Sequence, residues 1–233
     1  MMIPSQKIIL ALDTKDEAQL HSLLEEIKGE DIWLKVGMEF FYAFGAEKVK
    51  ELALNGQSLF LDLKLYDIPN TVYEAISSLS HLPIKMINVH CSGGLEMMKK
   101  AREATLKFKN PPLLIGVTVL TSFSEQEFTQ TNPQANLNST VIHLAKLAKE
   151  AHLDGVVCSP LEIKLIKEQC GQDFKTVTPG IRFDKNQTHD QKRIMNALEA
   201  HQAGADFMVI GRPITKSSSP RQALKKILQG ENP

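Results

Sequence analysis

The sequence has 233 residues, with 27 basic and 27 acidic side chains, a formal net charge of zero and 42% hydrophobic residues. A chain of this length and composition buries enough apolar surface to fold without disulfides or a structural metal, which excludes small cross-linked scaffolds. The balanced charge excludes an extended basic surface for nucleic acid or an anionic membrane. We therefore expect a small-molecule partner, with any anionic group bound by a local cluster of charges.

The cysteines and the N-terminal segment predict a cytoplasmic protein. Cys91, Cys158 and Cys170 are odd in number and widely separated, without the spacing of a zinc site, so a reducing compartment is the simplest interpretation. Only five apolar residues separate the first lysine from Asp13, far fewer than the roughly 18 of a membrane span. We expect neither a membrane anchor nor a bound metal.

Short apolar runs alternate with amphipathic stretches of helical length along the whole chain. This order predicts parallel strands joined by right-handed helical crossovers. The predicted strands are residues 8–13, 33–38, 58–65, 85–92, 112–120, 155–159, 174–181 and 207–214, with a polar loop inserted at 121–135.

Eight such units predict the α/β class and a closed (β/α)8 TIM barrel, formed as a single domain by residues 1–233. An open doubly wound sheet would use the same alternation. However, no G-x-G-x-x-G follows the first apolar run and no P-loop is present, so we favour the barrel.

Polar residues lie within or directly after most of the predicted strands. In a barrel, the C-terminal ends of the strands form the active site, so these side chains are expected to converge on one rim. They are Asp13, Lys35, Asp62, Lys64, His90, Thr118, Thr121, Ser159 and Arg212. Pro179 and Gly180 end the seventh predicted strand, and Gly211 precedes Arg212 at the end of the eighth.

The alternation within residues 59–65 predicts which way the charged residues point. Four leucines share one face, which would pack on the helices, so Asp62 and Lys64 point into the barrel. The same parity turns Lys35 and Asp13 inward. Opposite charges in a confined space favour each other's charged forms, and a charged lysine is a proton donor. The alternative is a purely structural ion-pair network.

The C-terminal part of the chain contains a candidate phosphate site. Gly211 and Arg212 follow the eighth predicted strand, where barrels often bind phosphate through a backbone approach and a bidentate guanidinium. The polar loop at 182–191 could close over such a ligand. An ordinary turn and a solvated surface loop are the alternatives for these two segments.

Several sequence blocks together resemble the orotidine 5′-phosphate decarboxylase family. The segment Asp62-Leu63-Lys64-Leu65-Tyr66-Asp67-Ile68-Pro69-Asn70-Thr71 is similar to the family signature D-x-K-x-x-D-I-P-N-T, which related sugar-phosphate enzymes partly share. The other matching blocks occur in the family's order: Leu10-Ala11-Leu12-Asp13, Leu34-Lys35-Val36-Gly37, Val119-Leu120-Thr121-Ser122, Thr178-Pro179-Gly180-Ile181-Arg182 and Ile210-Gly211-Arg212-Pro213-Ile214.

The resemblance implies a homodimer that decarboxylates orotidine 5′-monophosphate to UMP in pyrimidine biosynthesis, without metal or organic cofactor. By the same resemblance, Lys64 would protonate C6 of the pyrimidine and Asp62 would lie beside the departing carboxylate. Lys35 and Asp13 would contact the ribose hydroxyls and orient Lys64. Asp67 would reach into the neighbouring subunit's site.

The remaining residues carried over from the resemblance bind substrate. Thr121 would contact the base, while Arg212 and Gln191 would hold the phosphate. Other substrate-binding candidates are Thr71, Pro179, Arg182 and Gly211. His90 is given no catalytic role, because a histidine satisfied by hydrogen bonds inside a barrel is the commoner case.

Three alternatives to this function are weighed from the residues. A magnesium-dependent sugar-phosphate relative would need another acidic ligand, whereas Lys35 places a cation there. A non-catalytic nucleotide binder would have little reason to keep four costly charges in the barrel mouth. A Schiff-base aldolase requires a deprotonated lysine in an apolar pocket, which the neighbouring charges disfavour.

Overall fold

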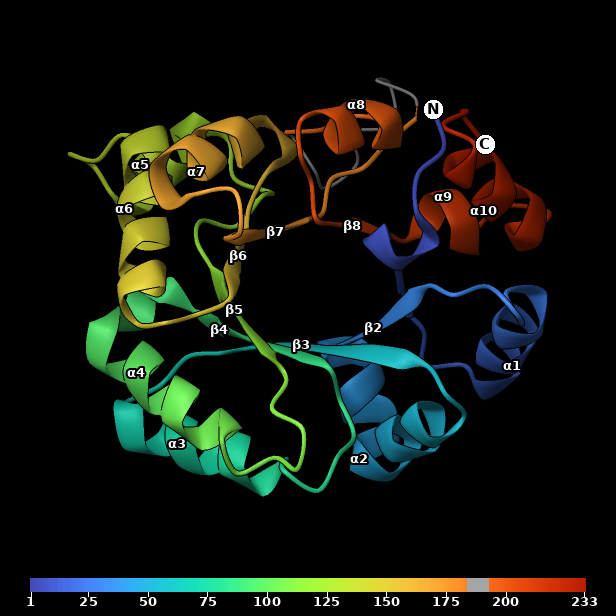
Figure 1. Cartoon of the computed structure of the whole chain (residues 1–233), viewed down its shortest axis with the longest axis horizontal. Coiled ribbons are helices and arrows are strands. Elements are labelled where there is room, and N and C mark those ends of the chain that lie inside the picture. Colours follow the sequence, from blue (N-terminus) through green and yellow to red (C-terminus); the bar gives the residue numbers. More distant parts are fainter. Residues whose placement is uncertain (184–192) are drawn as a thin grey trace.

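The computed structural model describes residues 1–183 and 193–233, and its centre is a closed barrel of eight parallel strands (Figure 1). The strands pair in chain order, and the last closes on the first. They are β1 (Ile8–Ala11), β2 (Trp33–Gly37), β3 (Ser58–Leu65), β4 (Met86–His90), β5 (Leu113–Val117), β6 (Gly155–Val157), β7 (Lys175–Thr178) and β8 (Phe207–Ile210). The predicted barrel is confirmed, and the doubly wound alternative is wrong.

Helices surround the barrel and cover the outer face of its strands (Figure 1). They are α1 (Glu17–Glu26), α2 (Met38–Leu54), α3 (Pro69–Ser78), α4 (Gly94–Thr105), α5 (Glu125–Thr131), α6 (Leu137–Glu150), α7 (Ile163–Cys170), α8 (Ala197–Gln202), α9 (Arg212–Thr215) and α10 (Pro220–Leu228), with short 3-10 turns η1 (Ser5–Lys7), η2 (Cys91–Gly93) and η3 (Pro160–Glu162). Within the described ranges, no helix is both long and apolar enough to cross a membrane.

Two apolar cores follow from the alternation of side chains along the strands. The inner core fills the barrel, and the outer core lies between the strands and the helices. In β3, Phe60 belongs to the inner core, whereas Leu59 and Leu61 belong to the outer one. The period-two prediction is therefore confirmed here, and it sends every second side chain toward the interior.

The strands end earlier than their apolar runs suggest. The prediction of a strand over 207–214 is wrong after Ile210, because Gly211 leaves the extended region (φ −113°, ψ −101°) and Pro213 lies in the first turn of α9. At β4, the turn η2 replaces the last two predicted residues.

The polar insertion at 121–135 is also more ordered than predicted. It contains α5, whose N-terminus is closed by a capping box between Ser124 and Glu127. The Ser124 side chain accepts a hydrogen bond from the Glu127 backbone, and the Glu127 carboxylate accepts one from the Ser124 backbone. Such reciprocal caps satisfy two otherwise unpaired N–H groups, which lets a short polar helix form.

Candidate active site

A cavity of about 810 Å³ opens at the C-terminal ends of the strands. It is lined by side chains from β1, β2 and β3 and by the loops that follow β5, β7 and β8. Among the residues predicted from the sequence, the cavity brings together Asp13, Lys35, Asp62, Lys64, Thr121, Pro179, Arg182, Gly211 and Arg212. The convergence of these residues on one rim is therefore confirmed.

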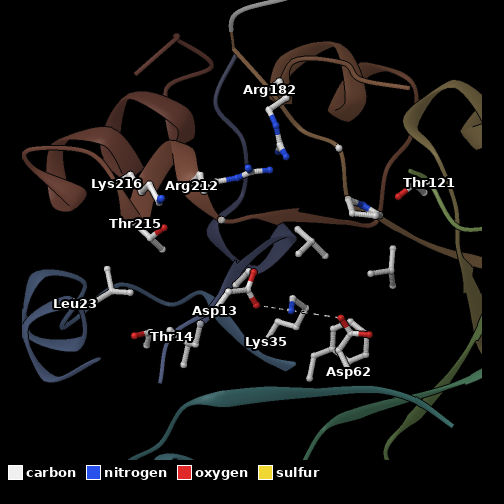
Figure 2. A pocket seen from close by; sticks show the side chains of 18 of the residues that line it. Asp13, Thr14, Leu23, Lys35, Asp62, Thr121, Arg182, Arg212, Thr215 and Lys216 are labelled. Atoms are coloured by element: carbon white, nitrogen blue, oxygen red, sulfur yellow. Dashed lines mark hydrogen bonds and ion pairs between the residues drawn. The ribbon is translucent and has the colours of Figure 1, made fainter. Parts of the chain in front are cut away.

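Four charged side chains form a continuous chain of alternating sign across one side of the cavity. Lys35 Nζ lies 3.0 Å from Asp13 Oδ1 and 3.4 Å from Asp62 Oδ2. Lys64 Nζ lies 2.6 Å from Asp62 Oδ1. The order is therefore Asp13, Lys35, Asp62, Lys64, and Figure 2 shows the first three of them in line.

The two inner members of this chain are almost completely buried, with side chains 11% (Lys35) and 10% (Asp62) exposed. Burial by itself lowers the pKa of Lys35, but Asp62 and Asp13 outweigh it and raise that pKa above its ordinary value of 10.5. Burial likewise raises the pKa of Asp62, but Lys35, Lys64 and the hydrogen bond from Asn88 bring it below its ordinary value of 3.8. Both groups are therefore charged at neutral pH.

The end of β2 leaves room for the ion pair between Lys35 and Asp13. A Cβ atom at Gly37 would lie 2.9 Å from Lys35 Nζ and 3.5 Å from Asp13 Oδ1. Any larger residue would push against the ammonium group, which is held by carboxylates on both sides. Gly37 therefore allows the close approach that the charge chain requires.

A local irregularity in β3 determines the position of Lys64. The pairing of β3 with β4 shifts register between Leu61 and Leu65, and Lys64 adopts a left-handed conformation with φ of 53°. A bulge of this kind redirects a side chain next to a functional site. The Lys64 side chain is 28% exposed, so its ammonium group is accessible from the cavity while it contacts Asp62.

The sequence reasoning missed Asn88, which lies in the middle of β4. Its side chain is fully buried, and its Nδ2 donates to Asp62 Oδ1 at 2.6 Å. Its Oδ1 accepts from the backbone N–H of Lys64 at 2.8 Å. The available signal is a polar residue that shares the inward parity of Met86 within an apolar run.

The other side of the cavity is cationic. Figure 2 shows Arg182, which follows β7, and Arg212, the first residue of α9, extending into the cavity toward each other and facing the charge chain. Thr215 and Lys216 also line this side and were not predicted. Two guanidinium groups beside a glycine-to-helix turn suit an anionic group such as a phosphate.

Five of the predicted residues that the structure describes do not line this cavity: Asp67, Thr71, His90, Thr118 and Ser159. Asp67 and Thr71 are exposed on the stretch from the end of β3 into α3 and lie outside the cavity lining. Gln191, with most of the predicted closing loop, lies outside the described residues. The predicted contact of Asp67 with a second subunit is not tested by a single chain and stays a prediction.

His90 lies at the end of β4, beside the charge chain. Its ring centroid is 5.7 Å from that of Tyr66. Burial lowers the pKa of His90, and the nearby Lys64 lowers it further. A neutral imidazole packed on a tyrosine adds no charge to the alternating series.

This arrangement can hold an anionic ligand by its cationic end and present an ammonium group to its other end. The Lys64 ammonium can stabilise and then protonate a carbanion that forms next to it. Within residues 1–183 and 193–233, no three His, Cys, Asp or Glu side chains are grouped as metal ligands.

Comparisons with known proteins agree on one family. The model of the "Orotidine 5'-phosphate decarboxylase / HUMPS family" matches residues 6–227. The chain is 46% identical over 222 residues to orotidine 5'-phosphate decarboxylase of Idiomarina loihiensis, covering 95% of this chain and 96% of that one. It is 47% identical over 224 residues to the enzyme of the same name from Legionella pneumophila (strain Lens), covering 96% and 98%.

Solved structures show the same likeness. The crystal structure of orotidine 5'-phosphate decarboxylase from Lactobacillus acidophilus matches with a TM-score of 0.85 and 38% sequence identity, covering 98% of this chain and 100% of that one. An uncharacterized conserved protein from Geobacillus kaustophilus matches with a TM-score of 0.84 and 36% identity, covering 97% and 100%. Both matches extend over nearly the whole barrel.

Proposed function

The chain belongs to the orotidine 5'-phosphate decarboxylase / HUMPS family, and we propose on this basis that it converts orotidine 5'-monophosphate to UMP and CO2 in pyrimidine biosynthesis. The observation that carries the proposal is the alternating chain of Asp13, Lys35, Asp62 and Lys64 opposite two arginines. It provides an ammonium group for the reacting carbon and a cationic end for the 5′-phosphate.

The two carboxylates around Lys35 favour this decarboxylation over the reaction of a magnesium-dependent sugar-phosphate relative. Lys35 Nζ lies within 3.4 Å of both Asp13 and Asp62, where a divalent ion would need to sit to use these carboxylates. An ammonium at that position neutralises the same oxygens and leaves a poor site for a hard cation.

The chemical step places its main demand on Lys64. Breaking the bond between C6 and the carboxylate releases CO2 and leaves an electron pair on C6, in the plane of the ring, where no π-system delocalises it. An adjacent ammonium at about 4 Å contributes roughly 4 kcal/mol at an effective dielectric of about 20, on the order of a thousandfold in rate. Lys64 Nζ then gives a proton to C6 and is reprotonated from solvent.

The other members of the charge chain orient the substrate and Lys64. Asp62 lies beside the departing carboxylate and holds the Lys64 ammonium through its contact at 2.6 Å. Lys35 and Asp13 contact the ribose hydroxyls. Because Lys35 links the two carboxylates, it also keeps Asp62 in place.

Most of the binding energy comes from groups that do not react. Arg182, Arg212 and the backbone at Gly211 bind the phosphate, Thr121 contacts the base, and Pro179 also lines the cavity. Gln191 is assigned to the phosphate by the family resemblance alone. Energy gained at the remote phosphate can organise the site around bound substrate and exclude water from the charge chain.

The proposal includes a homodimer in which Asp67 and Thr71 complete the neighbouring subunit's site. It is supported by the exposure of both residues and by their absence from the lining of their own chain's cavity. Tyr66 and Ile68, which flank Asp67, are 60% and 67% exposed. Large apolar side chains around an exposed carboxylate suit a surface that a second subunit covers.

Cofactor independence, a single domain over the whole chain and a cytoplasmic location also stay proposals. The three cysteines are buried and free, which suits a reducing compartment. Cofactor independence is tested in the same experiment as the activity, described next.

The testing experiment follows the ultraviolet absorbance of orotidine 5'-monophosphate as orotate becomes uracil, with excess EDTA present. Wild-type protein should convert the substrate rapidly. The kcat/KM of Lys64→Ala should be more than about a thousandfold lower, because this variant lacks both the ammonium charge beside C6 and the proton that C6 receives. Lys28→Ala is the matched control: this lysine is 72% exposed, pairs with Glu25 and lies away from the cavity. Turnover only after magnesium is added would favour the sugar-phosphate relatives instead.

A further inference from the structure

Asn88 connects Asp62 and Lys64, the last two members of the charge chain, although it does not line the cavity. Its Nδ2 donates to Asp62 Oδ1 at 2.6 Å, the same oxygen that contacts Lys64 Nζ. Its Oδ1 accepts from the Lys64 backbone N–H at 2.8 Å. Both ends of one fully buried amide are therefore used on two consecutive inward residues of β3.

The bond to the Lys64 backbone coincides with the irregular part of β3. Between Leu61 and Leu65 the regular pairing with β4 is interrupted, and Lys64 has φ of 53°. A left-handed conformation costs a residue other than glycine about 1 kcal/mol. The Asn88 side chain accepts the N–H of Lys64 in this interrupted stretch, and so stabilises the conformation that directs Lys64 toward Asp62.

The bond to Asp62 limits the rotation of its carboxylate. Asp62 Oδ2 faces Lys35, and Oδ1 receives both Lys64 Nζ and Asn88 Nδ2. An amide can supply this donor without adding charge, whereas a lysine or an aspartate at position 88 would disturb the alternation of sign. Apolar side chains fill the rest of the barrel interior, so packing alone does not require an amide here.

We propose that Asn88 is a positioning residue for decarboxylation, whose side-chain amide orients the Asp62 carboxylate and fixes the backbone of Lys64. This inference rests on the proposed function. Asn88 acts through Asp62 and Lys64 and does not touch the substrate.

The first test variant is Asn88→Asp, which has the same shape and keeps an oxygen to accept from Lys64. Burial and the nearby Asp62 carboxylate raise the pKa of the new carboxyl group. While protonated it donates to Asp62 as the amide does; once ionised it repels Asp62. The ratio of kcat in N88D to kcat in wild type should therefore be highest at acid pH and fall about tenfold or more as the pH rises.

The second variant is Asn88→Leu, which removes both hydrogen bonds and keeps the branched heavy-atom skeleton of the side chain. Its kcat should fall about ten- to a hundredfold at every pH, while KM changes less than about threefold, because the groups that bind phosphate and ribose are untouched. Thr176→Val is the matched control. Thr176 is equally buried and hydrogen-bonded to Asp206, outside the cavity, so this variant should lose stability but keep its kcat and pH profile.

Each outcome decides the proposal. Variants N88D and N88L with kcat within about threefold of wild type, or an N88D ratio independent of pH, would overturn it. If neither variant folds by circular dichroism, Asn88 serves the fold first and the positioning role fails.

The proposed function and this inference fail in different ways. If wild-type protein leaves orotidine 5'-monophosphate unchanged, the proposed function is wrong. In that case, the contact between position 88 and Asp62 is tested without substrate, by measuring the free energy of unfolding of N88D and N88L at several pH values. Because its folded-state pKa is raised, the new carboxyl group in N88D should make the free energy of unfolding fall as the pH rises, relative to N88L. Equal pH dependence in the two variants would overturn the contact itself.

Discussion

Lys35 and Asp62 are the two members of the charge chain that lie almost completely out of contact with water. A buried charge is costly by itself, and each of these residues has an opposite charge on both sides. The pKa of Asp62 lies below its ordinary value and that of Lys35 lies above it. Each charge is thus more stable in the folded protein than in the unfolded chain, so the pair links folding to pH.

Stability should fall at both ends of the pH range. Because the folded-state pKa of Asp62 is lowered, its contribution is present above its ordinary value of 3.8 and lost as the pH falls through the folded-state pKa. Because that of Lys35 is raised, its contribution is present below 10.5 and lost as the pH rises through the folded-state pKa. Urea unfolding across both ranges measures these losses.

The control for this prediction is Asp62→Asn, which keeps the shape of the side chain and removes its titration. Other carboxylates also titrate in acid, so the informative quantity is the difference in acid slope between wild type and D62N. The variant should have the shallower slope below about pH 4. Identical slopes would show that Asp62 binds its proton equally well in the folded and unfolded states.

At the scale of elements, close approach between neighbouring strands depends on particular small residues. Gly155, the first residue of β6, pairs with Ile115 of β5 and with Lys175 of β7. A Cβ atom there would collide with the carbonyl oxygen of Lys175 and lie 2.7 Å from its carbonyl carbon. These are backbone atoms that cannot rotate away, so only glycine allows β6 to pair at this distance.

Gly155→Ala should lower the free energy of unfolding by about 3 kcal/mol, because β6 must move away from β7. The matched control is Gly29→Ala. Gly29 has φ of 88° but open space around a new Cβ, so this change should cost only about 1 kcal/mol. Denaturant unfolding of the two variants measures both costs, and equal costs would contradict a steric role for Gly155.

At the scale of the whole molecule, one chain supplies only part of the proposed site. The charge chain and the arginines face the cavity, whereas Asp67 and Thr71 are exposed and do not line it. In a symmetric dimer, the surface that gives Asp67 to the partner receives the partner's equivalent group in return. The two sites would then depend on each other's subunits for a complete set of residues.

Mixing two inactive variants tests this shared site. Asp67→Ala lacks the group given to the partner, and Lys64→Ala lacks the proton donor of its own cavity. After subunit exchange, half of the dimers should be hybrids with one complete site each, restoring about a quarter of wild-type activity per subunit. The ultraviolet assay before and after exchange measures the recovery.

A second mixture controls for recovery by other routes. Lys64→Ala and Lys35→Ala both change the cavity of their own chain, so their hybrids contain no complete site and should stay inactive. If Asp67→Ala and Lys64→Ala recover no activity despite demonstrated exchange of subunits, Asp67 acts within its own chain or not at all.

Much of the fold and part of the site could be predicted from the sequence, because the relevant signals are local. The alternation in residues 59–65 predicted the inward direction of Asp62 and Lys64, and the order of strands and helices predicted the closed barrel. Strand boundaries were less predictable. Apolar residues such as Ile214 continue past β8 into α9, where Gly211 and Pro213 end the strand.

The sequence by itself determined the barrel, its inward charges and the family. Only the tertiary structure decided the order Asp13, Lys35, Asp62, Lys64, the left-handed backbone of Lys64 and the role of Asn88 as its partner. Side-chain parity is set by neighbours in the chain, whereas these contacts depend on the register between strands that are distant in sequence. A shift in that register at β3 brings Asn88, 24 residues away, onto the N–H of Lys64.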